Sequence, residues 1–188
     1  MKSTVNQPFF VISAPSGAGK NSLIALLLEK EDRLNHSISC TTRKKRNYET
    51  EGLNYYYLTK GEFEKKIGED EFLEYAKVLD NYYGTSRTEI DRIFALGKFP
   101  ILDIDIQGML NLRTKTLHFV SIFIMPPSVE ELRRRLVLRG SESEEEINKR
   151  LELAETEMQY ASQFDHSVVN YDLNQARDEM LTIIRSYL

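Results

Sequence analysis

The sequence of 188 residues is poor in cysteine, lacks tryptophan and has no long apolar run. Cys40 is the only cysteine, so no intramolecular disulfide can form, and we expect a cytoplasmic protein in a reducing compartment. No apolar run approaches the roughly 18 residues of a membrane-spanning helix, so we expect no contact with a membrane. The apolar stretch at Phe9–Ile12 leads directly into a loop of small residues, which indicates a buried strand rather than a signal peptide.

The sequence also lacks an excess of positive charge. Its formal net charge is -4, whereas general nucleic-acid binding requires a basic surface, so we expect no nucleic-acid partner. The three histidines, His36, His118 and His166, are scattered without the spacing of metal ligands, and we predict no metal site at them. The sequence leaves open whether the chain is a monomer or a homo-oligomer.

Apolar runs of strand length alternate with helical patterns along much of the chain. The predicted strands are Phe9–Ile12, Pro100–Ile106, Phe119–Ile124 and a short one at Val168 and Val169; a last helix follows with Asp172 as its N-cap. This alternation predicts an α/β fold with a mainly parallel sheet covered by helices on both faces. Two segments depart from it: residues 36 to about 96 resemble a small mixed insertion, and residues 139 to about 160 an exposed, charged, helical flap.

The first predicted strand is followed by a loop of small residues, a lysine and a helix. Such a loop lets backbone N–H groups surround phosphate oxygens, while the lysine reaches the transferring phosphates, as in a P-loop. A plain glycine-rich turn is the weaker interpretation, because strand, loop, lysine and helix occur in order. The predicted ATP-binding residues here are Ala14, Pro15, Ser16, Gly17, Ala18, Gly19, Lys20, Asn21 and Ser22.

The metal shell is the unusual part of this loop. The residue after the lysine is usually Ser or Thr, whose hydroxyl helps to hold Mg²⁺, but here it is Asn21. An amide oxygen can bind Mg²⁺ or one of its waters with a different reach. Alternatively, the metal is held mainly by ATP and water, with help from an acid at the end of the Pro100–Ile106 run, where Asp103 and Asp105 are the candidates.

The insertion and the segments after it carry motifs whose spacing resembles the guanylate kinase family, a group of P-loop nucleoside monophosphate kinases. They include Ser39–Arg46 with Glu49, Gly52 and Tyr55, then Phe72–Ala76, Asn81–Thr85, Ile104–Gly108, Pro126–Ser128, Arg135–Gly140, Arg150 with Leu151, and Val169 with Asn170. The resemblance covers about residues 8 to 185. It implies a P-loop core (about 1–36, 97–134 and 163–188), a small mixed α/β GMP-binding part (about 37–96) and a helical lid (about 135–162).

The resemblance implies transfer of a phosphoryl group from ATP to GMP, with Mg²⁺ accompanying ATP. Arg43, Arg46, Tyr55 and Tyr83 would hold the GMP phosphate by charge-assisted and hydroxyl hydrogen bonds. Glu74 would accept from the N1–H and 2-amino group of guanine. Ser39, Thr85 and Asp105 would lie near the base. At the position of Thr85 the family more often has Ser, which carries the same hydroxyl group. Asn170 would lie near adenine. Arg135, Arg139 and Arg150 would act with Lys20 and Arg43 on the phosphates when the lid closes.

Each of these features also has a plainer interpretation. Arg43–Arg46 could be a solvated basic turn, Glu74 an exposed strand residue, and the flap a solvated helix of Glu–Arg pairs. Three other functions are weighed against GMP phosphorylation: a kinase for AMP or a pyrimidine nucleotide, a protein-interaction domain that has lost catalysis, and an RNA-binding module. Glu74 and Asp105 disfavour the first, the retained lysine and arginines the second, and the net charge the third.

Overall fold

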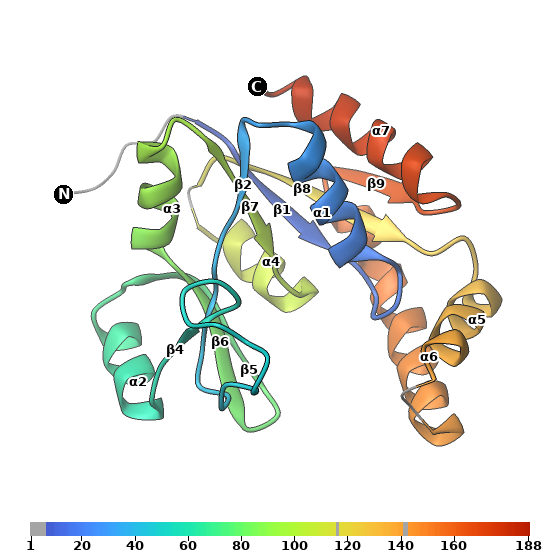
Figure 1. Cartoon of the computed structure of the whole chain (residues 1–188), viewed down its shortest axis with the longest axis horizontal. Helices are drawn as coiled ribbons and strands as arrows, with labels where there is room; N and C mark the ends of the chain where they lie inside the picture. The colour runs from blue at the N-terminus through green and yellow to red at the C-terminus, as the bar shows by residue number, and fades with distance from the viewer. Residues whose placement is uncertain (1–6, 116, 141–142) are drawn as a thin grey trace.

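A five-stranded parallel sheet forms the centre of the molecule. The computed structural model describes residues 7–115, 117–140 and 143–188, and of Arg139 only the backbone. The strands lie in the order β2 (Leu34–His36), β7 (Phe99–Asp103), β1 (Phe9–Ser13), β8 (Phe119–Met125) and β9 (His166–Val169), and every neighbouring pair is parallel (Figure 1). This sheet and its helices confirm the predicted α/β class.

The middle strand, β1, is buried on both faces. Its five residues are all buried, as expected for a strand in a sheet with helices on either side. Because side chains alternate along a strand, Phe10 and Ile12 enter one apolar cluster while Phe9 and Val11 enter another. The residues after this strand therefore start from a rigid position in the middle of the sheet.

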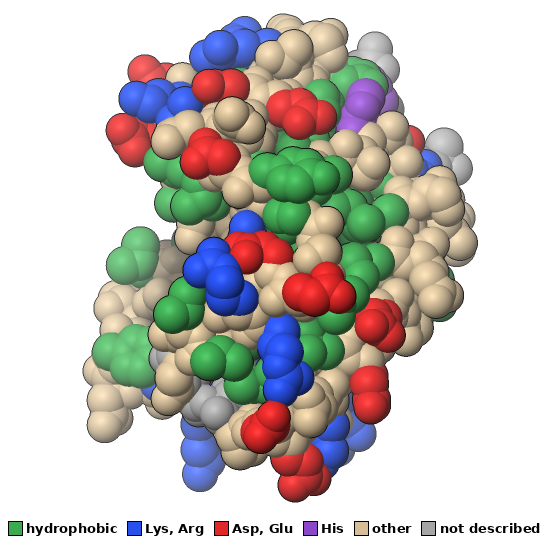
Figure 2. All heavy atoms as spheres, turned by 90° about the vertical axis from the view of Figure 1, so that its right-hand side faces the viewer, with side chains coloured by type: hydrophobic (Ala, Val, Ile, Leu, Met, Phe, Trp, Pro, Cys, Tyr) green, Lys and Arg blue, Asp and Glu red, His purple; other side chains and the backbone are tan. Residues whose placement is uncertain are grey.

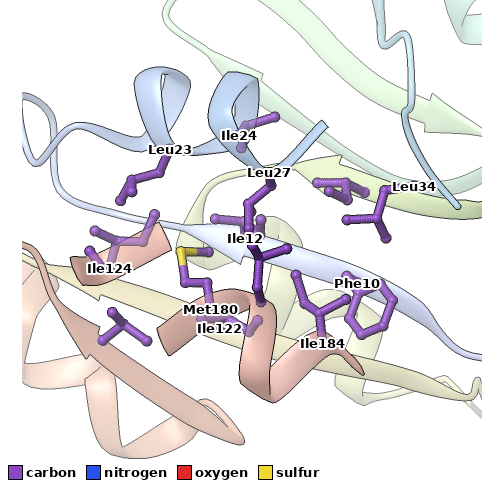
Figure 3. Packing of buried hydrophobic residues seen from close by; sticks show 14 of the residues in the cluster. Phe10, Ile12, Leu23, Ile24, Leu27, Leu34, Ile122, Ile124, Met180 and Ile184 are labelled. Carbon is purple, nitrogen blue, oxygen red and sulfur yellow. The ribbon is translucent and has the colours of Figure 1, made fainter. Parts of the chain in front are cut away.

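Helices cover each face of the sheet. On one face, α1 (Lys20–Lys30) packs beside α7 (Leu173–Arg185), and Figure 3 shows Leu27 of α1 and Met180 and Ile184 of α7 meeting Ile12 of β1. On the other face lie α3 (Arg87–Ala95), α4 (Ile106–Arg113) and the short 3₁₀ helix η1 (Gln159–Gln163). Asp172 caps α7 as predicted, since its Oδ1 accepts from the backbone N–H groups of Asn174 and Gln175.

The predicted strand at Pro100–Ile106 is too long. In the structure β7 ends at Asp103, and α4 starts at Ile106. The reason is Asp105, whose Oδ1 accepts from the backbone N–H of Gly108 at 2.7 Å and so makes Asp105 the N-cap of α4. Apolar residues alone do not separate the end of a buried strand from the start of a buried helix.

A second, mixed sheet lies below the first in Figure 1. It has the order β4 (Tyr56–Tyr57), β3 (Cys40–Thr41), β6 (Asn81–Ser86), β5 (Phe72–Val78), and the helix α2 (Lys60–Gly68) packs on it. Cys40 is buried, with only 4% of its surface exposed, next to Phe63 and Phe72. Burial raises the pKa of its thiol to about 11, so Cys40 packs as an apolar side chain.

The charged flap predicted at residues 139 to about 160 consists mainly of the helix α6 (Glu144–Met158), which packs against the preceding helix α5 (Val129–Arg139). They share a small apolar cluster, in which Leu132 and Leu136 meet Ile147 and Leu151. Ser143 caps α6 by a capping box with Glu146. Figure 2 shows side chains of both charge signs interspersed over the face of the molecule that includes this pair. In the part of the chain described, no helix combines the length and the apolar character needed to cross a membrane.

Candidate active site

The loop between β1 and α1 has the backbone of an anion-binding loop. Gly17 and Gly19 have φ angles of 92° and 97°, in the left-handed region that side chains disfavour. A Cβ at Gly17 would lie 2.9 Å from Leu132 Cδ1, and one at Gly19 would lie 2.5 Å from Asn170 Nδ2. Gly19 is the N-cap of α1 and has no side chain with which to occupy the first N–H groups of the helix. These donors suit a phosphate group.

Side chains from distant parts of the chain hold this loop in shape. Asn170, only 1% exposed, donates from Nδ2 to the carbonyl of Ala18 at 2.7 Å. Arg150 on α6 donates to the hydroxyl of Ser16 at 2.6 Å. Arg135 on α5 donates to the carbonyl of Asn170 at 2.9 Å and contacts Glu131 at 2.9 Å. Two of the three predicted lid arginines and Asn170 are thus at the loop, while the side chain of Arg139 lies outside the described atoms.

Lys20 forms an ion pair with Asp103 at the end of β7. Both residues line one cavity with Asn21, the residue that replaces the usual hydroxyl, whereas Ser22 is exposed on the first turn of α1. The amine of the loop lysine therefore meets the carboxylate of Asp103 where the parallel strands end, and Asn21 lines the same cavity. That edge is the usual ligand-binding crevice of an α/β sheet.

The cavity extends from this point to the second sheet and has a volume of about 350 Å³. It brings together five of the eight predicted GMP-binding residues and three residues predicted at the phosphate and metal end. Its lining consists of Lys20, Asn21, Ser39, Tyr55, Glu74, Ala76, Val78, Tyr83, Gly84, Asp103, Ile104 and Asp105.

Glu74 reaches the cavity from β5, although only 4% of its surface is exposed. A break in the β5–β6 register between Phe72 and Glu74, typical of a β-bulge, places Glu74 opposite Thr85. Thr85 donates to Glu74 Oε1 from its N–H at 2.9 Å and from its hydroxyl at 2.7 Å, so the Thr85 hydroxyl, itself buried, holds the carboxyl in place. Burial raises the pKa of Glu74 to about 7, against the lowering effect of the bonds from Thr85.

The two predicted phosphate-binding arginines are placed differently. Arg43 forms two hydrogen bonds with Glu49, of 2.7 and 3.0 Å, and its guanidinium lies 5.4 Å from the ring centre of Tyr55. Arg46 is exposed, and its side chain donates to the hydroxyl of Tyr48 at 2.8 Å. Tyr55 and Tyr83 contact each other edge to face with ring centres 6.0 Å apart. Arg43 is therefore fixed beside the cavity, while Arg46 points into solvent.

Glu49 organises the segment that carries Arg43 and Arg46, a role that the sequence patterns did not indicate. Its Oε2 accepts from the backbone N–H of Arg46 at 2.8 Å and from the hydroxyl of Tyr57 at 2.7 Å, in addition to the pair with Arg43. The hydrogen bonds from Arg43 are the main reason that the pKa of Glu49 falls to about 2. Its position between Arg43 and Tyr55 was the only sequence signal for this role.

The residues at the Lys20 end fit Mg²⁺ better than any metal that requires a complete protein cage. In the described part of the chain, no group of three or more His, Cys, Asp and Glu side chains could hold a metal by itself. Mg²⁺ needs fewer protein ligands, because it keeps several waters and binds through one or two carboxylates plus substrate phosphates. The carboxylate of Asp103 and the amide oxygen of Asn21, both at the cavity, meet that requirement.

Comparison with known proteins identifies the family of this chain. The model of the family described as Guanylate kinase matches residues 6–187. This chain belongs to the guanylate kinase family. It is 46% identical over 174 residues to a guanylate kinase of Clostridium perfringens, a match that covers 93% of this chain and 81% of that protein. It is 47% identical over 184 residues to a guanylate kinase of Yersinia pestis, with 97% and 89% covered.

A solved guanylate kinase shares the fold. The crystal structure of guanylate kinase from Anaplasma phagocytophilum superimposes with a TM-score of 0.75 at 34% identity, and the match covers 96% of this chain and 85% of that one. Membership of the guanylate kinase family confirms the resemblance inferred from the spaced motifs. It also agrees with a site that has a phosphate loop at one end and a buried carboxyl group at the other.

Proposed function

We propose that this chain is an ATP-dependent GMP kinase, which transfers the γ-phosphoryl group of ATP to GMP and gives ADP and GDP. The observation that carries the proposal is the single cavity lined by both Lys20 of the phosphate loop and Glu74 of the second sheet. A donor nucleotide at the loop and an acceptor at Glu74 would meet within it. In-line transfer needs this approach of two nucleotides more than it needs covalent participation by the protein.

At the acceptor end, the chemistry of the side chains favours guanine. A carboxylate can accept from both the N1–H and the 2-amino group of guanine, whereas adenine presents an acceptor nitrogen at N1. Glu74 is supported for this role by Thr85, which holds its Oε1, and Ser39 and Asp105 line the same end. Arg43, Tyr55 and Tyr83 would bind the acceptor phosphate, with Arg46 turning in from solvent. An ionised phosphate oxygen needs no general base to attack.

At the donor end, the loop amides, Lys20 and the arginines would bind the ATP phosphates. Lys20 would leave Asp103 for the β- and γ-phosphates, and Arg135 and Arg150 already contact the loop or its neighbours. We propose that Asn21 and Asp103 hold Mg²⁺, the latter through water, and that the ion neutralises developing charge on the phosphates when bound. Residues 37–96 would be the GMP-binding part, and residues 135–162 the lid, including Arg139.

A coupled assay of ADP formation with ATP, Mg²⁺ and GMP tests the proposal, with AMP as the competing acceptor. We expect turnover with GMP and a kcat/KM for AMP lower by orders of magnitude. The matched variants are Lys20→Ala in the loop and Lys30→Ala at the exposed far end of the same helix, of which only the first should lose turnover. Equal rates with GMP and AMP, or no dependence on GMP, would contradict the proposal.

A further inference from the structure

Two stretches of chain join the second sheet to the central sheet, and the first turn of α3 contacts both. The outgoing stretch is residues 37–39, between β2 and β3, and the returning one is the junction of β6 with α3 at Ser86. Ser86 is the N-cap of α3 and accepts from the backbone N–H of Glu89 at 3.2 Å. The side chain of the same Glu89 accepts from the backbone N–H of Ile38 at 3.0 Å. One residue therefore links the two crossings.

Glu89 is a buried carboxylate with a complete set of donors. Its side chain is 1% exposed, and Arg92 donates to it from Nε and Nη2, each at 2.8 Å. Tyr56 of β4 donates its hydroxyl to Oε2 at 3.2 Å. Burial raises the pKa of Glu89, but the hydrogen bonds from Arg92 and from the Ile38 N–H outweigh it and hold the pKa below its ordinary value. The carboxylate is therefore ionised and fully paired near neutral pH.

The partners of Glu89 are the immediate neighbours of residues that line the cavity. Ile38 precedes Ser39, and Tyr56 follows Tyr55. In addition, the backbone N–H of Tyr56 donates to the carbonyl of Ser39 at 2.9 Å, so the segment after Ile38 and the β4 strand are also bonded to each other. Glu89 itself is not among the lining residues. It can act on a bound nucleotide only through the position of these segments.

We propose that Glu89 is a positioning residue for the acceptor nucleotide, which fixes the segments bearing Ser39 and Tyr55 against α3 and thereby sets the GMP end of the cavity relative to the central sheet. This inference rests on the proposed function of the cavity. In Figure 1, α3 lies beside the central sheet and its first residues lie at the top of the second sheet, so it is placed to do this. The phosphate loop is held by other residues, so a substitution of Glu89 should not change its conformation.

Glu31 provides a control for effects on stability alone. It is also a buried carboxylate, 8% exposed in its side chain, and it pairs with Arg33 at 2.7 Å and Arg185 at 2.8 Å. It lies at the far end of α1 from the loop and does not line the cavity. Removing either carboxylate abolishes its charge-assisted hydrogen bonds to arginines whose side chains are themselves about half exposed, so both alanine variants should be destabilised. Only Glu89 has a link to the acceptor end.

The experiment compares the wild-type chain with Glu89→Ala, Glu89→Gln and Glu31→Ala, by steady-state kinetics in each substrate and by thermal unfolding. We expect Glu89→Ala to raise KM for GMP by about ten-fold or more, the effect of losing a hydrogen bond to a charged group, and KM for ATP by less than about two-fold. Glu89→Gln should recover most of the loss, because its amide oxygen can still accept from Ile38. Glu31→Ala should lower the Tm and leave KM for GMP unchanged.

The inference would be overturned by an unchanged KM for GMP in Glu89→Ala, or by an equal rise in KM for GMP in Glu31→Ala at the same loss of Tm. An equal rise in the KM values for ATP and GMP would also overturn it. If Glu89→Ala does not fold, Tyr56→Phe removes one of the links and should raise KM for GMP by about three-fold, and an unchanged value would then count against the role. A wild-type chain without GMP-dependent turnover would instead contradict the proposed function itself.

Discussion

The buried carboxyl of Glu74 makes the stability of this chain depend on pH in an unusual direction. Burial raises its pKa from 4.5 to about 7. Asp105 adds to this, while the bonds from Thr85 and the charge of Lys115 reduce it. A difference of about 2.5 pKa units corresponds to roughly 3 kcal/mol between the protonated and ionised forms, at about 1.4 kcal/mol per unit. Replacement by Gln, which is neutral at every pH, removes this contribution.

The direction in which stability changes with pH depends on whether the folded or the unfolded chain holds the proton on Glu74. Between about pH 4.5 and 7 the folded chain keeps a proton on Glu74 that the unfolded chain has released, so the free energy of unfolding falls as pH rises. Above both pKa values the contribution is constant, because neither state holds the proton. Urea unfolding of wild type and Glu74→Gln from about pH 5 to 8 should show the wild type losing roughly 2 to 3 kcal/mol relative to the variant.

Parallel stability curves for the two proteins would refute this reasoning, since they would mean that Glu74 titrates equally in the folded and unfolded chains.

The proton on Glu74 should also make GMP binding depend on pH. If Glu74 reads guanine as a carboxylate, GMP binding must release the proton below about pH 7, and GMP affinity should fall as the pH is lowered through that value. Calorimetry in two buffers of different ionisation enthalpy would measure the protons released per GMP bound.

Three further predictions concern the two ends of the cavity. Lys20→Ala should nearly abolish turnover but leave the affinity for GMP, measured by calorimetry, close to that of the wild type, because the lysine lies at the donor end. Glu49→Gln should raise KM for GMP several-fold with little change in KM for ATP, because it weakens the pair that fixes Arg43; equal changes in both constants would contradict this. Gly19→Ala should destabilise the chain by about 1 to 3 kcal/mol in urea unfolding and weaken ATP binding, because its backbone φ is 97° and its Cβ would collide with Asn170.

The sequence predicted the fold class and the position of the glycine-rich loop because these depend on local patterns. The run Phe9–Ile12 followed by small residues and Lys20 has one common structural meaning, and the structure places strand, loop and helix there. The exception, the end of β7, has a local cause as well: Asp105 caps α4, and apolar character alone did not reveal the change from strand to helix.

The sequence could not predict which partner each site residue has in the folded chain. Thr85 was expected near the base, and the structure adds that its hydroxyl donates to Glu74, eleven residues away in sequence and adjacent across a bulge. Asn170 was expected near adenine, and its amide holds the phosphate loop 152 residues earlier in the chain. Such pairings depend on how the two sheets and the last strand pack together. The spacing of residues within one segment of the sequence does not contain this information. Which nucleotide atoms these residues contact stays a prediction.

The packing of α1 against α7 has a consequence for how the chain acquires its shape during synthesis. The phosphate loop lies within the first twenty residues, but β1 pairs with strands about 90 and 110 residues later, and Met180 and Ile184 complete the cluster beneath α1. Contacts so distant in sequence form slowly, and translation proceeds from the N-terminus. The segment that would bind ATP is thus synthesised well before it can be fixed, since Asn170 and α7 must emerge before the loop can be held.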